Sequence, residues 1–174
     1  MIREATYDDA ARVARVHVES WRAAYRGLVS SDYLDSLSYE DGVRRWTRIL
    51  DPAAPSGFTY VLEDGGGSVV GFASAGPSRE GELVYRGELY SIYLLPEHWG
   101  RGHGRALVGV VAARLLRLNL DSMLVWVFAE NRAARFYEAL GAREIGEGVW
   151  EREEMRLRTL CYGWRDIRPL ASGD

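Results

Sequence analysis

Three alternating glycines, Gly100, Gly102 and Gly104, separate an apolar run from a long stretch with helical periodicity. Because glycine has no Cβ atom, a ligand can approach the main chain there and several N–H groups can converge on it. A helix start adds N–H groups without intrahelical partners and the positive end of the helix dipole, which favour a phosphate. Arg101 and Arg105 can pair with further phosphate oxygens. The spacing predicts a phosphate-binding turn, and the alternative is a tight connection whose glycines only relieve steric crowding.

The common nucleotide-binding motifs differ from this turn in residue detail. A Walker loop ends in Gly-Lys-Ser or Gly-Lys-Thr, and this sequence has neither. A dinucleotide fingerprint has the spacing G-x-G-x-x-G, with an acidic residue further on. Asp121 lies at about the right distance, but it precedes a predicted strand instead of ending one. A nucleotide-binding module is therefore a disfavoured alternative.

Glu88 is a candidate general base at the start of a strongly β-prone run, residues 88–95. In a regular strand it would share one face with Tyr90, Ile92 and Leu94, which is an apolar setting for a carboxylate. Partial desolvation there would raise the pKa of Glu88 and so its basicity. The alternative is a carboxylate in water at the end of a strand.

Tyr137 lies on an apolar stripe with spacing i, i+3, i+4 and i+7 that runs from Ala133 to Leu140. This pattern alone favours a core aromatic side chain. Asn131 is expected to cap the start of the same helix. The three histidines lie on different predicted elements without ligand spacing, and the single cysteine, Cys161, excludes an intrachain disulfide and a cysteine-based metal cluster. No metal site is expected.

Hydrophobic periodicity and turn residues predict the elements that position these side chains. Strands are expected over residues 2–5, 58–63, 69–75, 88–95, 123–128, 143–145 and 155–162. Helices are expected from residue 6 to about 19, in pieces over 21–37 broken at Gly27, and over 39–50, 104–118 and 131–140. Gly141 is expected just past the last helix. The order predicts one mixed α/β domain over residues 1–174.

The composition is that of a globular protein, with 47% hydrophobic and 27% charged residues in a chain of 174. The 22 basic and 25 acidic side chains leave a net charge of −3, so we expect no general attraction for nucleic acid or anionic lipid. Residues 1–9 contain no apolar signal region, and no stretch approaches the ~20 apolar residues of a membrane span. A cytoplasmic location is expected.

The glycine turn resembles the acyl-CoA signature of the GCN5-related N-acetyltransferase (GNAT) family, Gln/Arg-x-x-Gly-x-Gly/Ala after a strand. Gly102-His103-Gly104 match its glycines, and Trp99 stands in the Gln/Arg position, which departs from the pattern. Residues 131–141 resemble the second family signature, and residues 21–28 resemble a bacterial branch of the family. The resemblance covers residues 2 to about 162, and two motifs at the proper separation are more specific than either alone.

The resemblance implies a splayed mixed sheet of six or seven strands flanked by helices on both faces. It also implies direct transfer of an acetyl group from acetyl-CoA to a primary amine, without a metal. The acceptor would be a small-molecule amine or a protein amine, and homodimers are common in the family. The alternative is an acyl-CoA-binding sensor or regulatory domain without turnover.

The resemblance also implies roles for particular residues. Tyr137 would be the general acid for the departing CoA sulfur, and Glu88 would match a catalytic glutamate that some members carry. Trp21, Tyr25 and Tyr90 could line the acceptor pocket. The cofactor contacts would come from the main chain of Ile92, Tyr93 and Leu94, from the turn residues Trp99, Gly100, Arg101, Gly102, His103, Gly104, Arg105 and Ala106, and from Asn131.

Overall fold

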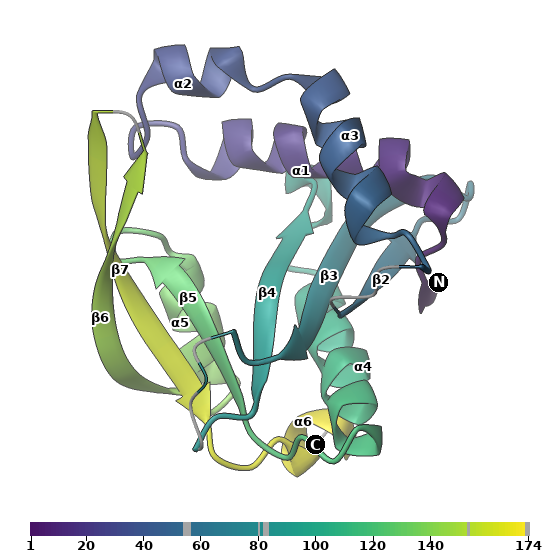
Figure 1. Cartoon of the computed structure of the whole chain (residues 1–174), viewed down its shortest axis with the longest axis vertical. Helices are drawn as coiled ribbons and strands as arrows, with labels where there is room; N and C mark the ends of the chain where they lie inside the picture. Colours follow the sequence, from purple (N-terminus) through teal and green to yellow (C-terminus); the bar gives the residue numbers. More distant parts are fainter. Residues whose placement is uncertain (54–56, 80, 82–83, 153, 173–174) are drawn as a thin grey trace.

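The fold is described from a computed structural model that covers residues 1–53, 57–79, 81, 84–152 and 154–172 (Figure 1). The strands are β1 (Ile2–Glu4), β2 (Phe58–Glu63), β3 (Val69–Pro77), β4 (Gly87–Leu94), β5 (Met123–Phe128), β6 (Arg143–Arg152) and β7 (Met155–Trp164). The α-helices are α1 (Ala10–Ala24), α2 (Ser31–Ser36), α3 (Tyr39–Ile49), α4 (His103–Arg117), α5 (Ala133–Ala139) and α6 (Arg168–Ser172). Two 3-10 turns, η1 (Tyr7–Asp9) and η2 (Pro96–His98), precede α1 and α4.

The seven strands form one sheet in the order β1-β2-β3-β4-β5-β7-β6. Neighbouring strands are antiparallel except β4 and β5, which are parallel. That parallel pair has two register pairs, Gly87 with Met123 and Glu88 with Leu124. Beyond these pairs the two strands diverge toward the side of α1 and α2 (Figure 1). The predicted splayed, mixed sheet is confirmed, and it has seven strands.

Helices cover both faces of the sheet. Tyr93 stacks on His17 of α1 with 5.2 Å between the ring centroids. The next residue, Leu94, points the other way, and its Cδ1 would lie 3.8 Å from a Cβ built on Gly104 of α4. The helix α3 packs on α1, and α5 packs on β5 and β7. The helices α1 and α3 therefore cover one face at β4, and α4 covers the opposite face.

The helix α4 buries the apolar face that its sequence predicts. Leu107, Val108, Val111 and Leu115 are fully buried. Leu118, the next apolar residue at this helical spacing, is 45% exposed, because α4 ends at Arg117 and Leu118 is its C-cap. The buried stripe fixes how α4 lies on the sheet and so places its first turn beside the end of β4.

Some element boundaries differ from the prediction. The first helix runs on to Ala24, so Trp21 belongs to it, and the predicted break at Gly27 is confirmed by a φ of +84°. The strand β6 extends over Arg143–Arg152 instead of residues 143–145, because pairing with β7 outweighs the low strand propensity of its glycines. The short helix α6 was not predicted. Among the described residues, no helix is long and apolar enough to cross a membrane.

Candidate functional site

The glycine turn lies between η2 and α4, directly before the helix, as the sequence predicts. Gly100 and Gly102 have φ values of +71° and +80°, in the region that favours glycine. Gly102 is the N-cap of α4 and offers no side chain to the first N–H groups of the helix, which lack intrahelical partners. A Cβ atom built at either glycine would meet no atom within 4 Å. The turn therefore combines helix-start donors with open space above the main chain, which suits an anion.

The requirement for glycine at position 104 has a different structural cause. A Cβ atom there would lie 3.1 Å from Cζ and 3.2 Å from Cε2 of Phe136 on α5. These distances are shorter than ordinary carbon–carbon contacts of about 3.5–4.0 Å. Gly104 therefore lets α5 pack against the first turn of α4, so steric relief explains this glycine but not Gly100 or Gly102.

A groove leads from the turn along α4 toward α6. Its end at the glycine turn is lined by three of the predicted cofactor contacts, Gly102, Arg105 and Ala106. The rest is lined by residues of α4, by the C-cap of α5 and by α6: Gly109, Val110, Ala113, Leu140, Leu170, Ala171 and Ser172. A ligand with a phosphate at the glycine turn could continue along this groove. Arg101 is exposed beside it, and His103 is the first residue of α4.

Trp99 connects the turn to the end of β4. Its indole Nε1–H donates to the carbonyl oxygen of Leu94 at 2.7 Å, and the side chain is 48% exposed. The hydroxyl of Ser20 on α1 donates to the same oxygen at 3.1 Å. The residue that departs from the family pattern thus fixes the turn against the strand.

The outer edge of β4 presents main-chain groups beside the diverging β5. The amide of Leu95 donates to Val70 of β3 at 2.9 Å. Because hydrogen-bonded pairs alternate along an antiparallel ladder, Tyr93 also bonds to β3, whereas the main chains of Ile92 and Leu94 point away from it. Of the three predicted main-chain contacts, Ile92 and Leu94 face the opening and Tyr93 does not.

A β-bulge in β4 changes which side chains share a face. The register with β3 shifts at Ser74 and Ala75, so Tyr90 is an extra residue between Leu89 and Ser91. Glu88 and Tyr90 therefore lie on the face of α1, and Ile92 and Leu94 lie on the face of α4. The prediction that Glu88 shares a face with Ile92 and Leu94 is therefore wrong, because the sequence pattern does not show the bulge.

Glu88 is buried, with 1% of its surface exposed, where β4 and β5 make their last pair. Its Oε2 accepts from the main-chain N–H of Arg79 at 2.9 Å. Its Oε1 accepts from Nε of Arg79 at 3.1 Å and also from Nη2. The guanidinium lies over the ring of Tyr90 at 4.4 Å from the centroid, and the Tyr90 hydroxyl donates to the carbonyl of Pro77 at 2.7 Å. A carboxylate can accept about four hydrogen bonds, so Oε2 retains one acceptor position beyond these three.

Tyr137 is buried on α5 and belongs to the main core, as its sequence pattern alone predicts. Burial and, to a smaller extent, the nearby Tyr25 raise the pKa of Tyr137 above the ordinary value of tyrosine. The side chain is therefore neutral at neutral pH and can donate a proton, although it is a weaker acid than an exposed tyrosine. Burial is the main cause that raises the pKa of Tyr93, and Tyr137 also contributes, so the two tyrosines lie near each other.

Two further tyrosine hydroxyls meet in this region. The hydroxyls of Tyr25, at the end of α1, and Tyr93, on β4, are 3.0 Å apart. Burial raises the pKa of both side chains. Asn131 lies near Tyr25, and its Oδ1 accepts from the N–H of Ala133, the first residue of α5, at 2.9 Å. The N-cap position itself is Arg132, so Asn131 binds the start of the helix from one residue earlier than predicted. The sequence predicted only a main-chain role for Tyr93, because nothing in its spacing indicates where the hydroxyl points.

Aromatic rings form the wall between α1 and the β6–β7 hairpin. Trp21 lies 4.6 Å from Tyr25 and 6.3 Å from Trp150, measured between ring centroids. His17 accepts a hydrogen bond at Nδ1 from the indole of Trp46 at 3.1 Å. Burial and, secondarily, Arg45 lower the pKa of His17 to about 4, so it is neutral at neutral pH. These contacts place Trp21 and Tyr25 beside the opening, where they were predicted to line an acceptor pocket.

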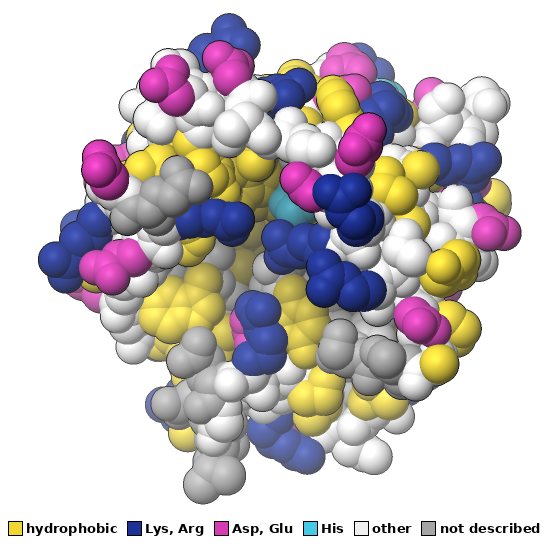
Figure 2. Space-filling model, turned by 45° about the horizontal axis from the view of Figure 1, so that its top comes forward, with side chains coloured by type: hydrophobic (Ala, Val, Ile, Leu, Met, Phe, Trp, Pro, Cys, Tyr) yellow, Lys and Arg dark blue, Asp and Glu magenta, His cyan; other side chains and the backbone are white. Residues whose placement is uncertain are grey.

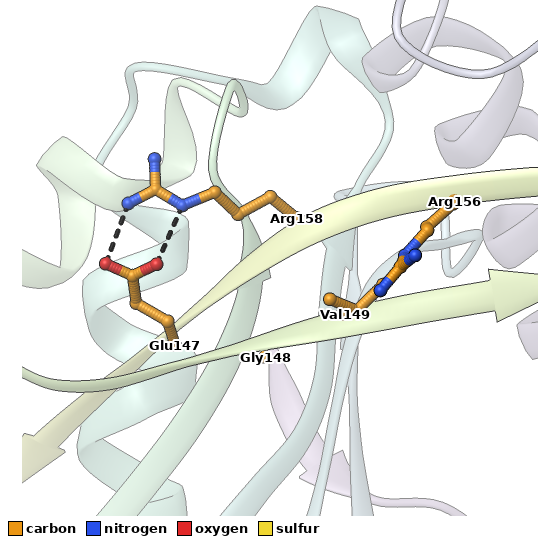
Figure 3. Close-up of a pocket in the computed structure, with 5 residues that line it drawn as sticks. All are labelled: Glu147, Gly148, Val149, Arg156 and Arg158. Carbon is orange, nitrogen blue, oxygen red and sulfur yellow. Dashed lines mark hydrogen bonds and ion pairs between the residues drawn. The ribbon is translucent and has the colours of Figure 1, made fainter.

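A second groove lies on the β6–β7 hairpin and is lined by Glu147, Gly148, Val149, Arg156 and Arg158 (Figure 3). Arg158 binds Glu147 through Nε at 3.0 Å and Nη2 at 2.9 Å. None of the predicted site residues lines this groove. Within the described part of the chain, no group of three or more His, Cys, Asp or Glu side chains could hold a metal ion.

The comparisons with known proteins agree with the fold. The model of the acetyltransferase (GNAT) family matches residues 16–142. The chain is 40% identical over 170 residues to the uncharacterized N-acetyltransferase YuaI of Bacillus subtilis, covering 97% of this chain and 95% of YuaI. The chain belongs to the GNAT acetyltransferase family.

Solved structures share the fold at low sequence identity. The PaiA N-acetyltransferase of Thermoplasma acidophilum in complex with coenzyme A has a TM-score of 0.65 and 18% identity, with 92% of this chain and 96% of PaiA covered. The yncA protein of Salmonella typhimurium with its cofactor acetyl-CoA has a TM-score of 0.68 and 20% identity, with 94% of this chain and 92% of yncA covered. Relatives of this fold therefore bind CoA or acetyl-CoA.

Proposed function

We propose that this protein transfers an acetyl group from acetyl-CoA to a primary amine. The observation that carries the proposal is the glycine turn at the start of α4, next to the edge where β4 separates from β5. Leu94, at the turn, and Glu88 are six residues apart, which is about 20 Å along an extended strand. A long ligand with a phosphate at one end can therefore extend from the turn toward the buried part of the opening.

Three parts of the site fit acetyl-CoA. The turn from Gly100 to Arg105 would hold the pyrophosphate through helix-start N–H groups and arginine side chains. The main chains of Ile92 and Leu94 would bind the pantetheine arm, in the way that an added strand binds an edge. The groove beside Ala106 would hold the nucleotide end. Trp99 and Ser20 already donate hydrogen bonds to the carbonyl oxygen of Leu94. The main-chain N–H group of Leu94 would therefore be the group that binds the pantetheine arm.

The proposed reaction is a direct attack of the amine nitrogen on the thioester carbonyl. Glu88 accepts a proton from the ammonium at the remaining position of Oε2, directly or through a water molecule. The ion pair with Arg79 holds the Glu88 carboxylate in one orientation. Tyr137 protonates the departing CoA thiolate. No covalent enzyme intermediate is needed, because the amine is itself the nucleophile.

Release of free CoA from acetyl-CoA, measured against a panel of primary amines, tests this function. We expect amine-dependent release that exceeds hydrolysis without amine by at least tenfold for some acceptor. Cys161 is buried, so a thiol reagent should report mainly the CoA that is formed. Binding of acetyl-CoA without release for any amine would instead indicate the sensor or regulatory alternative.

A further inference from the structure

The face that carries α1, α2 and α3 is hollowed near its centre. Figure 2 shows apolar side chains inside the hollow. The strands β4 and β5 diverge toward α1 and α2, so side chains on this face of β5 lie beside the opening (Figure 1). A molecule that approaches the opening from this face would therefore meet the side chains of β5.

Three residues of β5 point to this face: Leu124, Trp126 and Phe128. The ring of Phe128 lies 5.0 Å from that of Tyr25, the C-cap of α1, measured between centroids. Side chains two and four residues earlier on a strand lie on the same side of the sheet. Leu124 pairs in register with Glu88 on β4. A row of apolar side chains therefore begins beside the proposed base and continues to Phe128.

The indole of Trp126 lies along the sheet. A Cβ atom built on Gly148 would lie 3.0 Å from Cζ3 and 3.3 Å from Cη2 of this indole. Gly148 belongs to β6, and β7 lies between β6 and β5. Because neighbouring strands are about 4.8 Å apart, the indole must extend over β7 to reach Gly148. One face of the ring therefore rests on the sheet and the other faces away from it, on the side of α1.

Packing holds this ring in place. The indole Nε1–H of Trp126 has no hydrogen-bond partner in the described part of the chain. The side chain is half-buried, so part of it remains open to contact. The ring packs beside the buried Tyr85 and Leu124. These observations describe a flat apolar surface that is supported from below by β6 and β7.

Aromatic side chains also surround the end of this row that lies away from Glu88. Phe128 is 5.4 Å from Trp150 and 6.2 Å from Trp21, measured between ring centroids. Both tryptophans are half-buried and pack in one cluster with Tyr33. Aromatic rings attract one another in offset and edge-on arrangements beyond the effect of their buried area. This surface therefore favours a ligand with a flat aromatic group.

We propose that the acceptor is an arylalkylamine, a primary amine joined by a short alkyl chain to an aromatic ring that stacks on Trp126. This inference rests on the proposed acetyl transfer and specifies its substrate class. Leu124 and Trp126 are two residues apart, which is about 7 Å along the strand. A short alkyl chain can span this distance and would place the amine beside Glu88, the group proposed to take its proton.

Acceptors with and without the ring test the proposal. Phenethylamine carries the ring, ethylamine lacks it, and putrescine has a second amine in its place. We expect kcat/KM for phenethylamine to exceed that for ethylamine and for putrescine by at least tenfold. Equal or better use of ethylamine or putrescine, with acetyl transfer intact, would overturn the inference and leave the proposed function standing. Failure of every amine would refute the proposed function and the inference together.

Variants of the ring and of its support assign the preference to Trp126. Trp126→Leu should lower the ratio of kcat/KM for phenethylamine to that for ethylamine at least tenfold, with acetyl-CoA affinity unchanged. Gly148→Ala should lower the same ratio at least threefold, because its methyl group would displace the indole without removing it. The matched control is Gly146→Ala on the same strand, where an added Cβ atom meets no atom within 4 Å. A ratio that is unchanged in Trp126→Leu, or in Gly148→Ala if Trp126→Leu does not fold, would overturn the inference.

Discussion

The hydroxyl and the ring of Tyr137 can be tested separately. Replacing the residue with phenylalanine removes the hydroxyl and keeps the ring that packs in the core. The ring is part of the core, so Tyr137→Phe should preserve most of the stability. If the hydroxyl protonates the CoA thiolate, turnover should fall on the order of 10²-fold while acetyl-CoA affinity barely changes. Steady-state kinetics and calorimetry measure the two quantities.

Tyr162→Phe is the matched control for this variant. Tyr162 is also a buried tyrosine, 6.3 Å from the ring of Tyr137, but its hydroxyl donates to Glu138 at 3.0 Å. It should retain normal turnover. If Tyr137→Phe also turns over normally and only its melting temperature falls, Tyr137 is a core residue and not the acid.

Glu88→Gln tests the proposed base. Glutamine keeps the volume and can still accept from Arg79, but it cannot take the proton of the ammonium. We expect a large fall in rate near neutral pH that shrinks as the pH approaches the pKa of the amine, where free amine needs no base. Profiles of the same shape that differ less than threefold would assign the proton to an ordered water molecule.

For single residues, the sequence predicts local backbone features better than it predicts which side chains contact each other. Gly100 and Gly102 lie in an open turn before α4, as their spacing predicts, because the turn is a local structure. The ion pair of Glu88 with Arg79 was not predicted, since it depends on how the chain turns between β3 and β4. The face shared by Glu88 was predicted wrongly, since the bulge at Tyr90 arises from pairing with β3.

The turn before α4 is the element on which cofactor binding depends. Gly102→Val should weaken acetyl-CoA binding at least tenfold, or ~1.4 kcal/mol, because its side chain would occupy the open space where the pyrophosphate approaches. Isothermal calorimetry on the folded variant measures this. Gly104 is a poorer test, since a side chain there would also displace Phe136.

The control variant for the turn is Gly67→Val. Gly67 also has a φ of +80° and no atom within 4 Å of an added Cβ, but it lies in the turn between β2 and β3. Both variants therefore carry a similar backbone strain. Equal acetyl-CoA affinity in the two folded variants would contradict the phosphate-binding role of the turn.

Most elements could be predicted from periodicity, and the exceptions have identifiable causes. The stripe of α4 is clear because four of its residues fall on one helical face. The strand β6 was predicted too short, because Gly146 and Gly148 have low strand propensity and its pairing with β7 is a tertiary effect. The divergence of β4 from β5 was predicted from the family resemblance alone, because no local sequence pattern encodes the distance between two strands.

For the molecule as a whole, His17 links stability to pH. Its pKa is lowered from 6.5 to about 4 in the folded state, so the unfolded chain binds the proton first as the pH falls. The free energy of unfolding should therefore decrease between about pH 6.5 and pH 4, by up to about 3 kcal/mol from this group. Urea unfolding at several pH values measures this.

His17→Asn isolates that contribution. Asparagine retains an acceptor for the indole of Trp46 but does not titrate in this range. The variant should lose less stability than the parent between pH 6.5 and pH 4, whatever its stability at pH 7. If the free energy of unfolding falls equally with pH in the two proteins, His17 does not cause the pH dependence of stability.

Transfer of the acetyl group itself is the most direct test of the central claim. Acetyl-CoA labelled with ¹³C in the acetyl group is incubated with the best acceptor amine, and mass spectrometry follows both products. The account predicts that each CoA released is matched by one labelled N-acetyl amine, and that Gly102→Val lowers both products together. Acetyl-CoA that binds and is released unchanged in the presence of every amine, or CoA released without a labelled amide, would contradict it.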